Sequence, residues 1–328
     1  MEQQIGFCTS HDGTRIAYAT VGEGPALVIP TTWLSHLQLN WQDPVARRFF
    51  EQLALHHTLV RYDQRGSGLS DRNRTDFTIE AELKDLETVI DHLKLKRLAL
   101  MSISVGGPIS VAYIARHPKR VSHLILYGSF ARGETIATKE LKTAMISLIR
   151  AHWGVGSKML ADLFFPGASP ILVEAFSNYQ RECATPEMAA KLLDVVYKAD
   201  VVHLLPGLRV TTLVLHRRLD KVIPFGLGRE LASLIPNAHF VPLEGDSHIP
   251  WYGDSDSVLR AVAEFLGDPV TVDQAVDSGQ PMAPDLTVAV DDPVAREARS
   301  LIGALDWVVL SRYRVIGDYT RHEETVRN

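Results

Sequence analysis

The sequence predicts an α/β fold built on one mostly parallel sheet of eight strands, with helices on both faces and an inserted helical cap. Over most of residues 1–267, short apolar runs of strand length alternate with segments of helical periodicity. Such alternation implies right-handed crossovers and a ligand crevice beyond the carboxyl ends of the strands. Between residues 131 and 207 the alternation stops and helical patterns prevail. We therefore expect a sheet domain of residues 1–130 and 208–267, with a cap of residues 131–207.

The strands are predicted from apolar runs and turn signals. Residues 5–9 and 15–21 flank Asp12-Gly13, a dipeptide that favours a tight hairpin, so the chain opens with an antiparallel ribbon. The wholly apolar run at 26–30 is typical of a strand buried on both faces of a sheet. Further strands are expected at 57–62, 97–103, 121–127, 210–216 and 238–242.

Helices are predicted between these strands. Asp43 and Pro44 supply an N-cap and a first-turn proline for a helix that ends near residue 54. From Thr78, an apolar stripe predicts a helix that covers the sheet, with its charged residues Glu80, Glu82, Lys84, Asp85 and Glu87 mostly facing water. Later helices are expected near 226–234 and 255–266.

Composition and charge narrow the function. The chain of 328 residues has a formal net charge of −5, which offers no basic face for a nucleic acid. No apolar run approaches the roughly 20 residues that span a bilayer, and the first residues lack a signal-peptide pattern, so we expect a cytoplasmic protein without membrane contact. The two cysteines, Cys8 and Cys183, are far apart and outside any metal-ligand spacing, which favours free thiols.

The most informative stretch lies around Ser104. An apolar strand leads into Ser104, and a helix-like segment follows it from about Ile109. Small residues two positions before and after it, Ser102 and Gly106, allow a sharp turn that exposes the central side chain at the carboxyl edge of the sheet. That is the position of a nucleophile.

A serine nucleophile needs a histidine base and a carboxylate that orients the imidazole. Asp220 follows the predicted strand at 210–216, and His248 follows the next strand. Both therefore belong at the same sheet edge as Ser104. Asp246 is the rival carboxylate, although its place just before His248 is more typical of a turn residue.

Several separate motifs give residues 1–267 a resemblance to the α/β-hydrolase family. They are the Asp12-Gly13 hairpin, the loop from Tyr62 to Asp71, the turn at Ser102–Gly107, and the loops of Asp220 and His248, all in family order. The resemblance implies Ser104 as nucleophile, His248 as general base and then acid, and Asp220 as the orienting carboxylate. It also implies an oxyanion hole formed by the backbone N–H of Val105 and of Thr32 or Trp33, and no metal or cofactor.

The resemblance implies a serine hydrolase acting on a carboxylic ester or lactone. The aspartate-dependent dehalogenase and epoxide-hydrolase chemistries are disfavoured because the turn carries serine. A ligand-binding sensor on the same scaffold, and a carbon–carbon bond hydrolase, are the alternatives. Trp33, Trp251 and Phe164 are candidates to line an apolar substrate pocket under the cap.

Three short segments are similar to hydrolase modules that bacteria join to nucleotide-cyclase or transcription-regulator domains: residues 12–18, 33–36 and 127–133. We expect no such output domain in this chain. Residues 268–291 have the composition of a linker, and Asp292-Pro293 begins an amphipathic helix. That helix would dock on the body, on a protein partner or on a second copy of the chain.

Asp63 and Arg65 are interpreted as a structural pair that braces its loop, and His36 has no assigned role. His56, His57 and His216 suit helix and strand ends better than a metal site.

Overall fold

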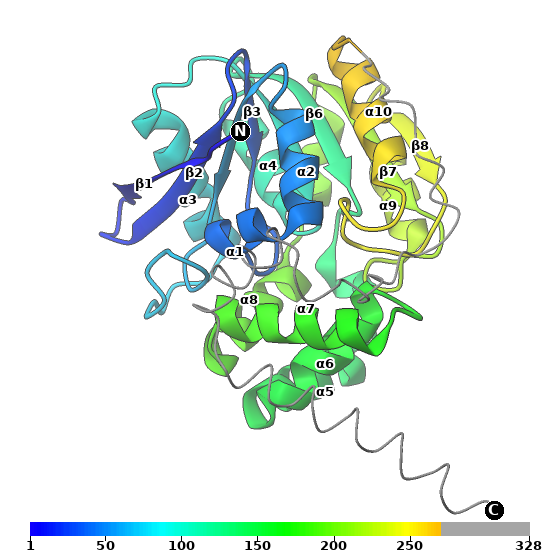
Figure 1. The fold of residues 1–328 in the computed structure, drawn as a ribbon. Coiled ribbons are helices and arrows are strands. Elements are labelled where there is room, and N and C mark those ends of the chain that lie inside the picture. Colours follow the sequence, from blue (N-terminus) through cyan, green and yellow to red (C-terminus); the bar gives the residue numbers. More distant parts are fainter. Residues whose placement is uncertain (270–328) are drawn as a thin grey trace, which may run out of the picture. The chain divides into compact units, whose positions relative to one another are not determined.

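The computed structural model describes residues 1–269. Its centre is one eight-stranded sheet in the order β1-β2-β4-β3-β5-β6-β7-β8, which confirms the predicted fold class (Figure 1). The strands are β1 (Gln4–Thr9), β2 (Arg15–Val21), β3 (Ala26–Ile29), β4 (Thr58–Tyr62), β5 (Leu98–Ile103), β6 (Val121–Tyr127), β7 (Thr211–Arg217) and β8 (His239–Leu243). β1 pairs with β2 and β2 with β4 in antiparallel fashion, whereas every later pairing is parallel. The loops that follow β3 to β8 therefore meet at one edge of the sheet.

Helices cover both faces of the sheet. On one face, α2 (Pro44–Leu53) and α10 (Ser255–Leu266) contribute buried side chains to one apolar cluster. On the other, α3 (Ile79–His92), α4 (Gly106–Arg116) and α9 (Phe225–Leu234) contribute to a second cluster. Alternate strand residues divide between the clusters, with Leu27 and Ile29 in the first and Val28 in the second. This alternation is the period of two expected for strands buried on both faces.

Four helices connect β6 to β7: α5 (Lys139–Ala151), α6 (Trp153–Phe164), α7 (Pro170–Cys183) and α8 (Pro186–Lys198). They lie together beyond one end of the sheet (Figure 1). Two short 3-10 turns, η1 (Gly133–Ile136) and η2 (Val202–Gly207), join them to the sheet. Buried side chains of α6 and α8, such as Phe164 and Met188, belong to the same apolar cluster as α2 and α10. The four helices are therefore packed on the sheet domain.

The structure corrects two expectations about charged residues. Glu82 and Asp85 of α3 do not face water, because they are 1% and 0% exposed. Arg65 is not paired with Asp63: its guanidinium makes two 2.7 Å bonds to the Asp85 carboxylate. Apolar periodicity missed this arrangement because the partner of Asp85 comes from a distant loop. A short helix that the sequence did not predict, α1 (Leu37–Gln42), begins at His36, whose Nδ1 caps it.

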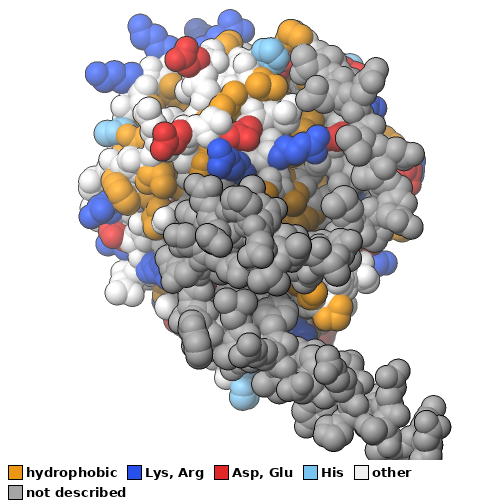
Figure 2. Space-filling model, in the orientation of Figure 1, with side chains coloured by type: hydrophobic (Ala, Val, Ile, Leu, Met, Phe, Trp, Pro, Cys, Tyr) orange, Lys and Arg blue, Asp and Glu red, His pale blue; other side chains and the backbone are white. Residues whose placement is uncertain are grey.

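Cys8 and Cys183 are both buried and free, as expected. Basic and acidic side chains are interspersed over the described part of the face shown in Figure 2. No helix within residues 1–269 is long and apolar enough to cross a membrane. The helix expected beyond residue 291 lies outside the described residues.

Candidate active site

Ser104 occupies the turn between β5 and α4 in a strained backbone conformation. Its φ is +54°, in the left-handed region that residues with a side chain rarely adopt. The turn is fixed on both sides: the Ser104 N–H donates to Tyr127 O at 3.0 Å, and Ser104 O accepts from the Ser129 hydroxyl at 2.9 Å. Gly107 is required here, because a Cβ on it would lie 1.9 Å from Ser129 Oγ. The surroundings thus hold Ser104 in this conformation.

His248 and Asp220 come from neighbouring loops, after β8 and β7. His248 Nδ1 lies 2.7 Å from Asp220 Oδ2, and both side chains are 1% exposed. The other carboxylate oxygen, Oδ1, accepts from the N–H groups of Val222 and Ile223 at 2.8 and 3.0 Å. These contacts orient the carboxylate, which in turn orients the imidazole. The rival Asp246 makes no such contact with His248 among the described residues.

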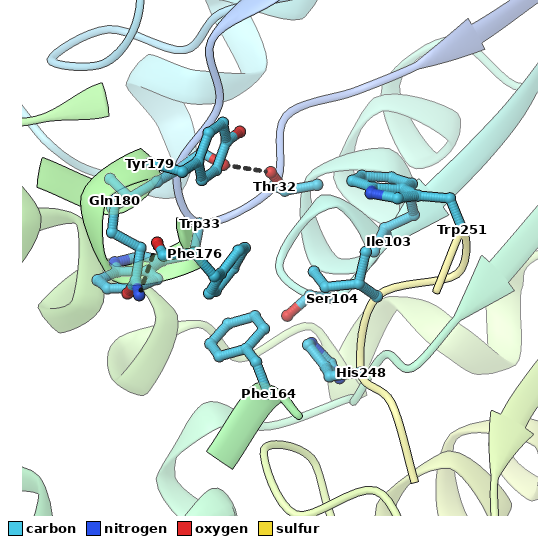
Figure 3. A pocket seen from close by; sticks show the side chains of 12 residues that line it. Thr32, Trp33, Ile103, Ser104, Phe164, Phe176, Tyr179, Gln180, His248 and Trp251 are labelled. Atoms are coloured by element: carbon cyan, nitrogen blue, oxygen red, sulfur yellow. Dashed lines mark hydrogen bonds between the residues drawn. The ribbon is translucent and has the colours of Figure 1, made fainter. Parts of the chain in front are cut away.

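The remaining imidazole nitrogen faces the cavity that Ser104 borders. His248 Nε2 is buried and has no hydrogen-bond partner among residues 1–269. Ser104 and His248 line one cavity, and Figure 3 shows the Ser104 hydroxyl and the His248 ring directed into it. The structure therefore brings together the three side chains that the sequence singled out at the carboxyl edge of the sheet.

The loop after β3 packs closely on the start of α4. A Cβ on Gly106 would lie 2.6 Å from Thr31 O, so only glycine allows this approach. Gln64, in the loop after β4, holds this loop through two hydrogen bonds: its Oε1 accepts from Thr31 Oγ1 at 2.6 Å, and its Nε2 donates to Trp33 O. The backbone at Thr31 is thus held beside the backbone at Gly106. No sequence pattern indicated this role of Gln64, since a buried amide has no periodic signature.

The family model described as "alpha/beta hydrolase fold" matches residues 25–254. The chain belongs to the α/β-hydrolase family. It is 29% identical over 262 residues to the AB hydrolase superfamily protein YisY of Bacillus subtilis, covering 75% of this chain and 92% of that protein. A non-heme chloroperoxidase of Kitasatospora aureofaciens is 26% identical over 79% of this chain and 98% of its own. Among solved structures, the enol-lactonase from Burkholderia xenovorans LB400 is 26% identical with a TM-score of 0.70, covering 80% of this chain and 100% of that chain.

The catalytic-edge cavity of this α/β-hydrolase is mostly apolar and lies under the cap. Trp33, Phe164 and Trp251 line it, as do Phe176 and Tyr179 of α7. The Phe164 ring packs edge-on against the His248 ring, with ring centroids 5.3 Å apart. The same ring stacks on Trp33, with ring centroids 6.3 Å apart. The cavity holds about 30 Å³, enough for only one or two waters.

A buried arginine holds the histidine loop. Arg217 donates to Glu244 O at 2.8 Å, and also to Tyr252 O and Asp254 O at 3.2 and 2.8 Å. These carbonyls lie on both sides of His248 in the chain, so the guanidinium ties the two ends of its loop together. Arg217 ends β7, and sequence patterns favour a solvent-exposed arginine at such a place.

His216 and His57, two of the other histidines, have structural partners. His216 Nε2 lies 2.8 Å from Ile223 O and 3.7 Å from Asp220 Oδ2, and burial lowers the pKa of this side chain. His57 Nε2 lies 2.7 Å from Asp268 Oδ2. Within the described part of the chain, no group of three or more His, Cys, Asp or Glu side chains is arranged to hold a metal ion.

Proposed function

We propose that this α/β-hydrolase cleaves a carboxylic ester or lactone with Ser104 as nucleophile, His248 as general base and acid, and Asp220 as the orienting carboxylate. The observation that carries the proposal is the 2.7 Å contact of His248 Nδ1 with Asp220, which leaves Nε2 directed into the cavity bordered by Ser104. A base must be held in the tautomer that leaves Nε2 unprotonated, and a carboxylate at Nδ1 achieves this.

In the proposed cycle, His248 Nε2 takes the Ser104 proton as Oγ attacks the carbonyl carbon. The carbonyl π electrons move onto oxygen, and the oxyanion is stabilised by the N–H of Val105 and that of Thr32, or of Trp33. Collapse expels the alkoxide, which receives the proton from His248, and leaves an acyl-enzyme. Water then attacks with His248 again as base, and the acid is released. In a lactone the leaving alkoxide stays attached to the acyl group.

The surroundings support an apolar substrate. Aromatic side chains surround the cavity, and Figure 3 shows Phe164 and Phe176 facing Ser104 across it. One of the similar structures is named as an enol-lactonase, and a lactone is one of the two substrate classes that we propose for this chain.

Labelling with a fluorophosphonate tests the proposal directly. We expect labelling of the wild type, loss of labelling in Ser104→Ala, and release of p-nitrophenol from a short p-nitrophenyl ester by the wild type alone. Ser110→Ala is the matched control, because its hydroxyl is buried one turn into α4 and bonds to Ser102 Oγ at 2.6 Å. That control should label normally. An unlabelled wild type that still binds an apolar ligand would instead favour a sensor on a hydrolase scaffold.

A further inference from the structure

Arg61 is a buried cation beside the catalytic edge that neither the fold nor the proposed chemistry explains. It lies on β4 with 5% of its surface exposed. Its guanidinium stacks on Phe50, with the carbon 3.8 Å from the ring centroid, and one nitrogen, Nη2, donates to Gln3 Oε1 at 2.7 Å. Burial lowers the pKa of Arg61 to about 10, so it stays protonated at neutral pH.

The other two buried arginines show what a satisfied guanidinium looks like in this protein. Arg65 makes a two-pronged contact with Asp85 and a further 3.0 Å contact with Asp12. Arg217 donates to the Tyr127 hydroxyl and to three backbone carbonyls. Arg61 has one hydrogen bond, to a neutral amide, and no carboxylate of residues 1–269 lies within 4.0 Å of it. The charge of Asp63 acts on Arg61 only from beyond this distance, and burial still outweighs it, because the pKa of Arg61 is lowered. A buried charge without a direct ionic partner is costly unless an anion binds there.

The free side of Arg61 borders a cavity. This second cavity, of about 30 Å³, is also lined by Ser35 and Asn40. The Ser35 hydroxyl lies near the Asp63 carboxylate but makes no hydrogen bond within the described residues. Asp63 itself is occupied, because its oxygens accept from the N–H groups of Leu37 and Leu69. The volume is that of about two waters, which the two oxygens of a carboxylate would replace.

The second cavity adjoins the catalytic one. Thr32, Ile103 and Trp251 line both. Arg61 on β4 and Ser104 after β5 are separated by β3, so their strands are about 10 Å apart across the sheet. The register places Arg61 level with Met101, so Ser104 lies three residues, about another 10 Å, further along its strand. A chain of several carbons joins two groups at this separation.

We propose that Arg61 binds a carboxylate carried by the acyl part of the substrate, which makes the preferred substrates monoesters of dicarboxylic acids or lactones that bear a carboxylate. Ser35 and Asn40 supply further polar contacts to the carboxylate oxygens, and the side chains of Thr32, Ile103 and Trp251 contact the connecting chain. The inference rests on the proposed ester hydrolysis. It adds that the substrate carries a negative charge and that Arg61 is the residue that binds this charge.

The test compares p-nitrophenyl monoesters of dicarboxylic acids of increasing length with the same esters ending in a neutral carboxamide. In the wild type, kcat/KM should favour the acid over the amide by at least about tenfold at the matching length, the size expected of one charge-assisted bond. Arg61→Met should remove the preference and leave kcat/KM for the neutral ester nearly unchanged. Arg61→Lys should retain part of it, because it keeps the charge without the planar fork. A structural role alone would lower both substrates equally.

Arg47→Met is the matched control, because Arg47 is an exposed cation. The guanidinium groups of Arg47 and Arg61 both lie over the Trp41 ring. Arg47→Met should keep the preference. A wild type without preference for the acid at any chain length, or a preference that survives Arg61→Met, overturns the proposal. If the wild type neither labels with fluorophosphonate nor cleaves any ester, the proposed function fails, and calorimetric titration with adipate still tests the site. Binding that is lost in Arg61→Met and only weakened in Arg61→Lys supports it, and no binding to the wild type refutes it.

Discussion

Gly128, directly after β6, gives the sharpest test of the His248 and Asp220 arrangement. Its φ is +55°, and a Cβ built on it would lie 3.1 and 3.2 Å from His248 Cε1 and Nδ1 and 3.5 Å from Asp220 Oδ2. Gly128→Ala therefore has two costs. The left-handed conformation costs about 1–2 kcal/mol for a residue with a side chain. In addition, the imidazole must move by a few tenths of an ångström from the position in which Asp220 holds it.

We expect Gly128→Ala to lower the free energy of unfolding by about 1–2 kcal/mol and kcat/KM by roughly 10- to 100-fold, because misplacement of a base by a fraction of an ångström to one ångström has this effect. Gly13→Ala is the control: its φ is +81° and nothing lies within 4 Å of its Cβ position. It shares the strain but not the contact with the histidine. Urea unfolding gives the stability, and p-nitrophenyl ester hydrolysis gives the activity. If the two variants are equally active, His248 is not the base held by this contact, and the argument is wrong.

Three other substitutions test separate parts of the structure. Asp220→Asn should lower kcat by roughly 10³–10⁴-fold. The amide oxygen still accepts from the Val222 and Ile223 N–H groups, so the NH₂ group donates to His248 Nδ1 and the imidazole carries its proton on Nε2, where it cannot act as a base. Pre-steady-state and steady-state ester hydrolysis measure kcat, and a near-normal value would exclude this role of Asp220. Asp85→Asn should cost about 3 kcal/mol in urea unfolding, because the buried Arg65 loses its two-pronged ionic partner and keeps only the contact with Asp12. A change near zero would contradict this. Burial raises the pKa of Glu82 well above its usual range, so the unfolded chain ionises first and native stability falls as pH rises above the unfolded pKa. Glu82→Gln should therefore gain stability over the wild type by up to about 1.4 kcal/mol per pH unit between about pH 5 and pH 7, and a gain that does not change with pH would refute the assignment.

The sheet and the positions of its strands along the chain could be predicted from the sequence, because burial on both faces produces short, continuous apolar runs. β3 and β5 are nearly continuous apolar runs, and the helices between strands carry apolar stripes. The positions of Ser104, Asp220 and His248 follow from that topology, since each comes directly after a parallel strand. The prediction needed no knowledge of side-chain packing.

The burial of charged side chains could not be predicted from the apolar pattern. Glu82 and Asp85 lie beside Leu83 and Leu86 on α3, and an apolar pattern assigns every charged residue to the solvent. Whether a charge can be buried depends on a partner that periodicity does not contain. Arg65, Arg61 and Gln64 come from β4 and the loop after it, and their neighbours come from α3, α2 and the loop after β3. Only the folded chain brings these groups together.

The edge of the sheet that carries Ser104 also depends on Gly128, which has no Cβ atom. β6 lies between β5 and β7, so its carboxyl end runs directly between Ser104 and the Asp220 loop. The backbone there continues the sheet, with the Gly128 N–H donating to Leu215 O at 3.0 Å, and the His248 ring packs on the place where a side chain would stand. The segment Tyr127-Gly128-Ser129 is therefore constrained at three successive positions: a hydroxyl that accepts from Arg217, a missing Cβ, and a hydroxyl that fixes the Ser104 carbonyl. A strand that contributes no reacting group thus determines whether the three groups on its neighbours can meet.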